Sequence, residues 1–265
     1  MARRLVRALA WAIAAYLLVA YVVLPALWTH YEHAPVMETV PKVTTTGAGI
    51  PGDPLNVAFV GSEGEVLAAF AAARWRRPAP IDVRSSIGIA ESVILDRPDP
   101  TAPVSYLYLF GRREDLAFEQ EVGTSAKQRN HVRFWRANEQ VDGRQLWLGA
   151  ATFDRGVGLS DRTGQITHHI GADVDAERDR VIADLEKAGQ LRTVFQVTGV
   201  GLTLVGRNGG GDPYHTDGEM DVGVLKRTDE TVIGAPDVLP NPPAVETKRR
   251  LFQWLRPWLR AADGE

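Results

Sequence analysis

The stretch that decides the fold is "NHVRFWRANEQVDGRQLWLGAATFD", from Asn130 to Asp154. Two parts of it, 130–137 and 144–154, are rich in the β-branched and aromatic residues that strands prefer. The same composition predicts further strands at three places, 104–111, 192–199 and 220–226. Strands outnumber helices, so few of their connections can be crossover helices. The sequence therefore predicts an α+β fold with a largely antiparallel sheet and two main helices.

The first main helix is expected directly after a buried strand at Leu55–Val60. Ser62 is a suitable N-cap for it, with Glu65 three residues further on, as in a capping box. The second helix follows "THHIGADVDAERDRVIADL" (Thr167–Leu185), where the early carboxylates favour the positive end of the helix dipole. We expect Asp175 and Asp179 to lie on solvent faces of this helix.

The N-terminus predicts one transmembrane helix before this domain. No charged residue lies between Ala8 and Trp28, and about 20 apolar residues suffice to cross a bilayer. The run is longer than the apolar part of a typical signal peptide and no clean cleavage site follows it, which favours an uncleaved anchor. Three arginines precede it, so the positive-inside rule predicts a single-pass protein of the cell inner membrane with its bulk outside the cytoplasm.

Composition divides the chain into five predicted segments. They are a transmembrane anchor at 1–28, a linker at 29–54, the α+β domain at 55–228, a Pro-rich linker at 229–247 and a basic amphipathic helix at 248–262. We expect Pro257 to kink or end the last helix. This helix suits either the membrane surface or docking on its own domain, and the sequence leaves the two open.

Bulk composition excludes several classes of function. The chain has 265 residues, of which 45% are hydrophobic, and a net charge of -3, which argues against nucleic acid as a partner. It has no cysteine, so disulfides and thiolate chemistry are excluded. A divalent metal, the one candidate cofactor, would need His, Asp or Glu ligands.

Two adjacent histidines, His168 and His169, are the first candidate for chemistry. In an extended segment they point to opposite faces, so only one can face a given site, and we favour His169. If "TFDRG" and "THH" lie on paired strands, Asp154 comes close to one of them and could make it a base or ligand. The predicted pocket also holds at least one of Arg112, Arg133 or Arg155. The candidate metal ligands are His169, Asp154 and Asp173.

A second candidate is a cluster of cations around His131. The cations are Arg112, Arg113, Lys127, Arg129 and Arg133. Such a cluster suits an anionic ligand such as a phosphate, although a solvated face paired with nearby acidic residues explains it equally well. Further on, Gly209–Gly211 could form an anion-binding nest or a loop, with His215 following. The predicted ligand-binding residues are Arg112, His131, Arg133, Arg155 and His215.

Five motifs together resemble the LssY C-terminal domain family of bacteria. They are "LFGRREDLAFEQ", "RNHVRFW", "WLGAATFDRGV", "THHIGADVDAERDRV" and "NGGGDPYHTDGEMDVGVL", and the resemblance runs from about Leu55 to Lys226. In that family the domain often lies behind membrane segments, and it is found joined to DedA-type and type 2 phosphatidic-acid-phosphatase-type membrane domains. The resemblance therefore implies a role in the cell envelope near lipid phosphates.

These observations favour a membrane-anchored envelope protein that binds a polar or anionic ligand, plausibly a lipid phosphate. One alternative is a metal- or histidine-dependent hydrolase acting on an envelope lipid or phosphoester, with His168 or His169 and Asp154 as catalytic residues. Another is a structural partner of an envelope transport system. The expected partners are membrane lipid, through the anchor and the C-terminal helix, and envelope proteins of unknown identity.

Overall fold

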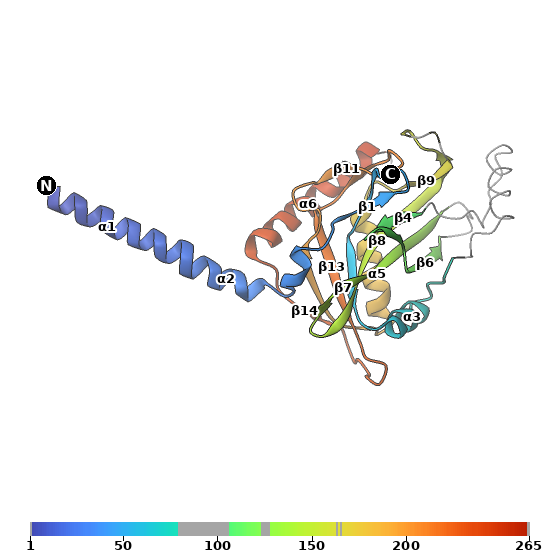
Figure 1. Ribbon diagram of the computed structural model, residues 1–265, viewed down its shortest axis with the longest axis horizontal. Coiled ribbons are helices and arrows are strands. Elements are labelled where there is room, and N and C mark those ends of the chain that lie inside the picture. Colours follow the sequence, from blue (N-terminus) through green and yellow to red (C-terminus); the bar gives the residue numbers. More distant parts are fainter. Residues whose placement is uncertain (1, 79–105, 123–127, 163, 165, 264–265) are drawn as a thin grey trace.

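A computed structural model describes residues 2–78, 106–122, 128–162, 164 and 166–263. It confirms the predicted class, a mixed α+β fold with largely antiparallel sheets that follows one long N-terminal helix (Figure 1). The predicted cation Lys127 and the first residues of the strand predicted at 104–111 lie outside the described residues.

The main sheet has the strand order β14-β10-β13-β3-β8-β7-β6, with β9 paired to β8. Its strands are β3 (Val57–Val60), β6 (Leu116–Glu121), β7 (Arg129–Val141), β8 (Arg144–Leu159), β9 (Ile166–Ile170), β10 (Leu191–Thr198), β13 (Glu219–Leu225) and β14 (Asp237–Val238). Two pairs are parallel, β13 with β3 and β10 with β14, and the other pairs are antiparallel. The stretch at 130–154 forms most of the long hairpin β7–β8, which lies between β3 and the edge strand β6.

Two smaller sheets complete the domain. One has the order β2-β1-β4-β5, from β1 (Val43–Thr46), β2 (Pro51–Pro54), β4 (Leu107–Leu109) and β5 (Arg112–Arg113). The other pairs β11 (Val205–Arg207) with β12 (Pro213–His215).

Helices α3 (Glu63–Ala72) and α5 (Val174–Lys187) contribute to the core on one face of the main sheet. The predicted capping box at Ser62 and Glu65 is present at the start of α3. An aromatic cluster lies beneath this helix, where Phe70 stacks on Phe118 with 4.2 Å between ring centroids and meets Phe134 edge-on. On α5 the expectation of a solvated Asp175 is wrong, because this carboxylate is buried and accepts hydrogen bonds from Thr216 and the Asp217 amide.

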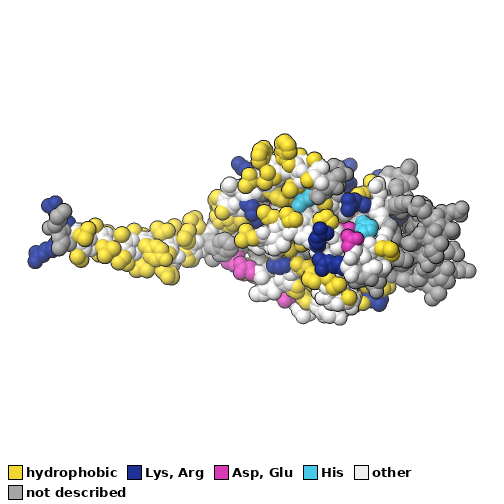
Figure 2. Space-filling model, turned by 90° about the horizontal axis from the view of Figure 1, so that it is seen from above, with side chains coloured by type: hydrophobic (Ala, Val, Ile, Leu, Met, Phe, Trp, Pro, Cys, Tyr) yellow, Lys and Arg dark blue, Asp and Glu magenta, His cyan; other side chains and the backbone are white. Residues whose placement is uncertain are grey.

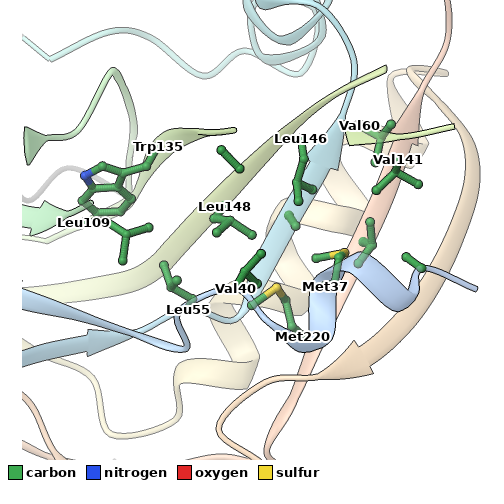
Figure 3. Packing of buried hydrophobic residues seen from close by; sticks show 14 of the residues in the cluster. Met37, Val40, Leu55, Val60, Leu109, Trp135, Val141, Leu146, Leu148 and Met220 are labelled. Atoms are coloured by element: carbon green, nitrogen blue, oxygen red, sulfur yellow. The ribbon is translucent and has the colours of Figure 1, made fainter. Parts of the chain in front are cut away.

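The opposite face of the sheet carries a second apolar core (Figure 3). Met37, from a 3₁₀ helix at Pro35–Glu38, packs there with Val40, Leu148 and Met220. This corrects the predicted linker at 29–54, because most of that segment is part of the domain. Its prolines and threonines lie in strands β1 and β2 and in the turn between them. Strand β1 pairs with β2 on one side and with β4 on the other.

The N-terminal helix is continuous through α1 (Ala2–Leu18), a π-helical segment (Val19–Val23) and α2 (Leu24–Tyr31). Within it, Arg3–Leu27 is long and apolar enough to cross a membrane, and none of its most apolar stretch is buried against the domain. In Figure 2 this helix projects from the domain, its surface is mostly hydrophobic, and cationic side chains lie at its free end. This arrangement fits a membrane-anchored protein.

The C-terminal helix α6 (Pro243–Asp263) is longer than predicted at both ends. It begins within the predicted Pro-rich linker and continues through Pro257, where the expected break is absent. Proline costs the helix one backbone hydrogen bond, and this proline lies on an exposed side where water can serve the freed carbonyl.

Candidate functional site

The candidate site lies on the same face of β7 and β8 as the second apolar core, further along both strands. Side chains alternate between the two faces of a strand, so His131 and Arg133 share a face with Trp135, while Val132 and Phe134 point toward the helices. The register pairs His131 with Thr152 and Arg129 with Asp154. One face of the hairpin is thus apolar at one end and ionisable at the other.

This ionisable end forms the wall of a cavity of about 430 Å³. Strands β7, β8 and β9 supply His131, Arg133, Asp154 and His168. The other side consists of the small sheet and two loops, which contribute Thr46–Ala48, Asp53, Tyr106–Tyr108, Ser160 and Asn208–Gly210. A cavity of this size with a few convergent polar groups is typical of small-molecule sites.

Asp154 is the buried centre of the polar network. It is fully shielded from solvent, with Oδ1 3.0 Å from His131 Nδ1 and Oδ2 accepting a hydrogen bond of 3.1 Å from Arg129 Nε. Burial alone would raise its pKa, but His131 and Arg129 outweigh this effect and hold the pKa of Asp154 well below its usual range. Arg129 also donates to Glu119. Asp154 is therefore an ionised carboxylate that organises its neighbours.

His168 is neutral, and its proton can be assigned. Burial, helped by the charges of Arg129 and Arg133, lowers its pKa to about 4. Its Nε2 lies 3.0 Å from Arg129 Nη2. A guanidinium only donates, so Nε2 must accept and the proton must be on Nδ1. That Nδ1 is buried and has no hydrogen-bond partner among the described residues. His168 thus offers an N–H donor rather than a free base.

His131 is also engaged at both ring nitrogens. Nδ1 faces Asp154, and Nε2 lies 3.1 Å from Thr152 Oγ1. The order Thr–His–Asp is that of a nucleophilic triad, but Thr152 is completely buried, so its hydroxyl orients the ring instead of meeting a ligand.

The pKa of Asp53 is shifted in the opposite direction from that of Asp154. Burial raises its pKa, and the partly compensating Arg133 Nη1 lies 3.5 Å from its Oδ2. Sequence reasoning missed Asp53 because its segment was taken as a linker. It also missed Asn208 and the pairing role of Arg129, which only the strand register shows.

The structure brings some predicted residues together and separates others. His131, Arg133, Asp154 and His168 line one cavity. The preference for His169 is wrong, because strand alternation turns it away, with Nδ1 2.7 Å from Asp212 Oδ1 and the ring against Gly158.

The other predicted residues are placed elsewhere. Arg112 pairs with Asp115 at 2.8 Å on the surface, and Arg155 is exposed and does not line the cavity. His215 is buried 3.8 Å from Asp173, whose carboxylate also binds Arg256. The metal candidates His169, Asp154 and Asp173 therefore belong to three separate networks. Among the described residues no group of three His, Cys, Asp or Glu side chains is arranged to hold a metal ion.

Together these features define a class: a membrane-anchored α+β domain with a polar cavity formed by the end of a long hairpin. The family model described as LssY C-terminus matches residues 37–220, and the chain belongs to that family. All the cavity residues lie inside the matched range, and α6 lies outside it. No curated protein and no solved structure matches the chain.

Proposed function

We propose that the cavity binds a polar ligand through an anionic group, with a phosphate carried by an envelope lipid as the leading candidate. The observation that carries the proposal is the buried Nδ1–H of His168, a donor without a partner among the described residues, on the same wall as Arg133. A buried donor without a partner costs free energy, and an anionic oxygen would satisfy it.

The geometry supports binding better than hydrolysis by a histidine. The proton-accepting nitrogen of His168 is occupied by Arg129, and both nitrogens of His131 face protein groups. A histidine-dependent hydrolase would need one of these ring nitrogens to be free, so Asp53 is the remaining candidate acid or base of the cavity.

The test uses substitutions that imitate one ring nitrogen at a time. Glutamine can place an oxygen near the Nε2 position, and asparagine can place an amide near the Nδ1 position. His168→Gln then keeps the acceptor for Arg129 and loses the donor, while His168→Asn keeps the donor. Because hydrogen bonds to charged groups contribute about 1.5–3 kcal/mol, His168→Gln should weaken binding about tenfold or more, and His168→Asn much less.

The measurement is calorimetric titration of the full chain in detergent. The ligands are short-chain phosphatidic acid, inorganic phosphate and, as a neutral comparison, short-chain diacylglycerol. His169→Gln is the matched control, since the neighbouring ring lies outside the cavity, and it should bind like the wild type. Equal affinity of the wild type and His168→Gln for both phosphates would contradict the proposal.

The proposed location is the cell inner membrane, with the domain outside the cytoplasm. Support comes from the three arginines before the apolar helix, which the positive-inside rule retains in the cytoplasm. The chain lacks cysteine, so Gln253→Cys adds a single exposed thiol. A membrane-impermeant thiol reagent should label this variant in spheroplasts as fully as in lysed cells. Labelling only after lysis would place the domain on the cytoplasmic side.

A further inference from the structure

The outer side of α6 carries an exposed apolar stripe. Leu251, Trp254, Leu255 and Trp258 follow the spacing i, i+3, i+4, i+7 and therefore share one helix face. Their exposed fractions are 57%, 67%, 38% and 71%.

The opposite side of α6 is held on the domain mainly by ions. Arg256 donates to Asp173 at 2.5 Å and to Asp179 at 3.0 Å, and Arg260 donates to Asp173 at 2.6 Å. Lys248 pairs with Glu219, and Phe252 is the apolar residue of α6 that is buried. Lys248, Arg256 and Arg260 thus face the protein, whereas the four apolar side chains of the stripe face outward. Arg249 and Arg250 pair with Glu246 of the same helix. This reverses the usual arrangement of a surface helix that docks by its apolar face.

The position of α6 identifies what covers the stripe. Its first turn lies beside the point where the N-terminal helix ends, because His33 Nε2 is 3.0 Å from the Pro240 carbonyl, and Tyr31, Pro242 and Val245 line one small pocket. In Figure 1 the axis of α6 runs across the direction of the N-terminal helix. A helix that begins beside the end of a membrane span and runs across its direction is placed near the membrane surface.

We infer that α6 lies in the surface of the membrane that anchors the chain, with Trp254 and Trp258 inserted between its lipids. Tryptophan is the residue that membrane interfaces enrich most clearly, and an apolar stripe next to an existing anchor needs little further affinity to insert. This contact goes beyond the proposed ligand binding and does not depend on it.

Two consequences follow. Because the cations of α6 already pair with carboxylates, insertion relies on apolar contacts and should not require anionic lipid. In addition, Arg260 at the far end of α6 contacts Asp173, three residues after Ile170 of the cavity wall. Insertion of α6 would therefore hold the cavity close to the lipid headgroups.

The experiment uses the full chain in vesicles of phosphatidylcholine alone. A single spin label is placed at Leu251→Cys on the stripe or at Gln253→Cys, which is exposed on the other side of the same helix. Oxygen concentrates in lipid, and a nickel chelate stays in water. The ratio of oxygen to nickel accessibility should be severalfold higher at 251 than at 253, and adding phosphatidylglycerol should leave it unchanged.

The double substitution Trp254→Glu, Trp258→Glu should remove this difference while the N-terminal helix still holds the protein in the vesicle. Equal, water-like ratios at 251 and 253 in the otherwise native chain would overturn the inference. Low accessibility of position 251 to both reagents would also overturn it, because a protein partner would then cover the stripe. Phosphate binding in detergent, tested separately, is unaffected by either result.

Discussion

Two buried carboxyls, one on each side of strand β8, have pKa values shifted in opposite directions. Asp154, on the cavity side, contacts His131 and Arg129, which keep its pKa low. Glu177, on α5 at the other side, has an Oε1 without a hydrogen-bond partner among the described residues, and Arg180 Nε lies 3.8 Å from its Oε2. Burial raises the pKa of Glu177 to about 8.

The difference shows that burial alone does not decide whether a carboxyl is charged. Both side chains are almost completely shielded, Asp154 at 0% and Glu177 at 3% exposure. The neighbouring charges decide: Arg129 donates a hydrogen bond to Asp154 and the His131 ring lies 3.0 Å from its Oδ1, whereas Glu177 has, among the described residues, only Arg180, 3.8 Å away. Asp154 therefore organises the cavity, whereas Glu177 lowers the stability of the fold at neutral pH.

The largest expected change in stability comes from removing the Asp154 carboxylate. Asp154→Ala leaves Arg129 and His131 buried without their shared partner, which should cost about 3–5 kcal/mol of unfolding free energy at pH 7. Urea unfolding of the full chain in detergent measures it. Asp161→Ala, at an exposed position on the loop after β8, is the control and should change stability by about 0.5 kcal/mol at most. An unchanged urea midpoint for Asp154→Ala would show that the network contributes little.

Local pattern was enough to predict much of the fold. The β-branched and aromatic segments gave β7, β8, β10 and β13, and the Ser62–Glu65 pair gave the start of α3. Each of these signals comes from neighbouring residues, and the tertiary structure agrees with them. The segment at 35–54 was misread because its prolines and threonines suit a linker and a short edge strand equally well.

The site was predictable only in part, because it depends on register. The adjacent histidines His168 and His169 could be assigned to opposite faces of a strand from the sequence. Choosing His168 required the β8–β9 register, which pairs Val157 with His168 and shifts by one residue near Asp154. Arg129 meets Asp154 through the β7–β8 register, and Asp53 arrives from a separate sheet. Spacing along the chain carries no information about these pairings.

Substitution of Glu177 should change the unfolding free energy by less than substitution of Asp154, and in the opposite direction. The pKa of Glu177 in the folded chain, about 8, lies above its unfolded value of about 4.5, so the fold favours the neutral form. The stability from this group is complete below pH 4.5 and is lost as pH rises toward 8. Methionine has a similar length and carries no charge. Glu177→Met should therefore gain about 3 kcal/mol at pH 7, and the gain should shrink toward zero at pH 4.5.

Urea unfolding at a series of pH values between 4.5 and 8.5 measures this gain, with Glu186→Met as the matched control. Glu186 is exposed on the same helix, so its substitution should give a small change that does not vary with pH. The pH dependence separates removal of a buried charge from a simple packing effect, because extra apolar contact stabilises equally at every pH. A constant gain across the series would mean that Glu177 is already ionised and solvated in the fold. The contrast with Asp154 would then lie in access to water and not in the donors that each carboxyl meets.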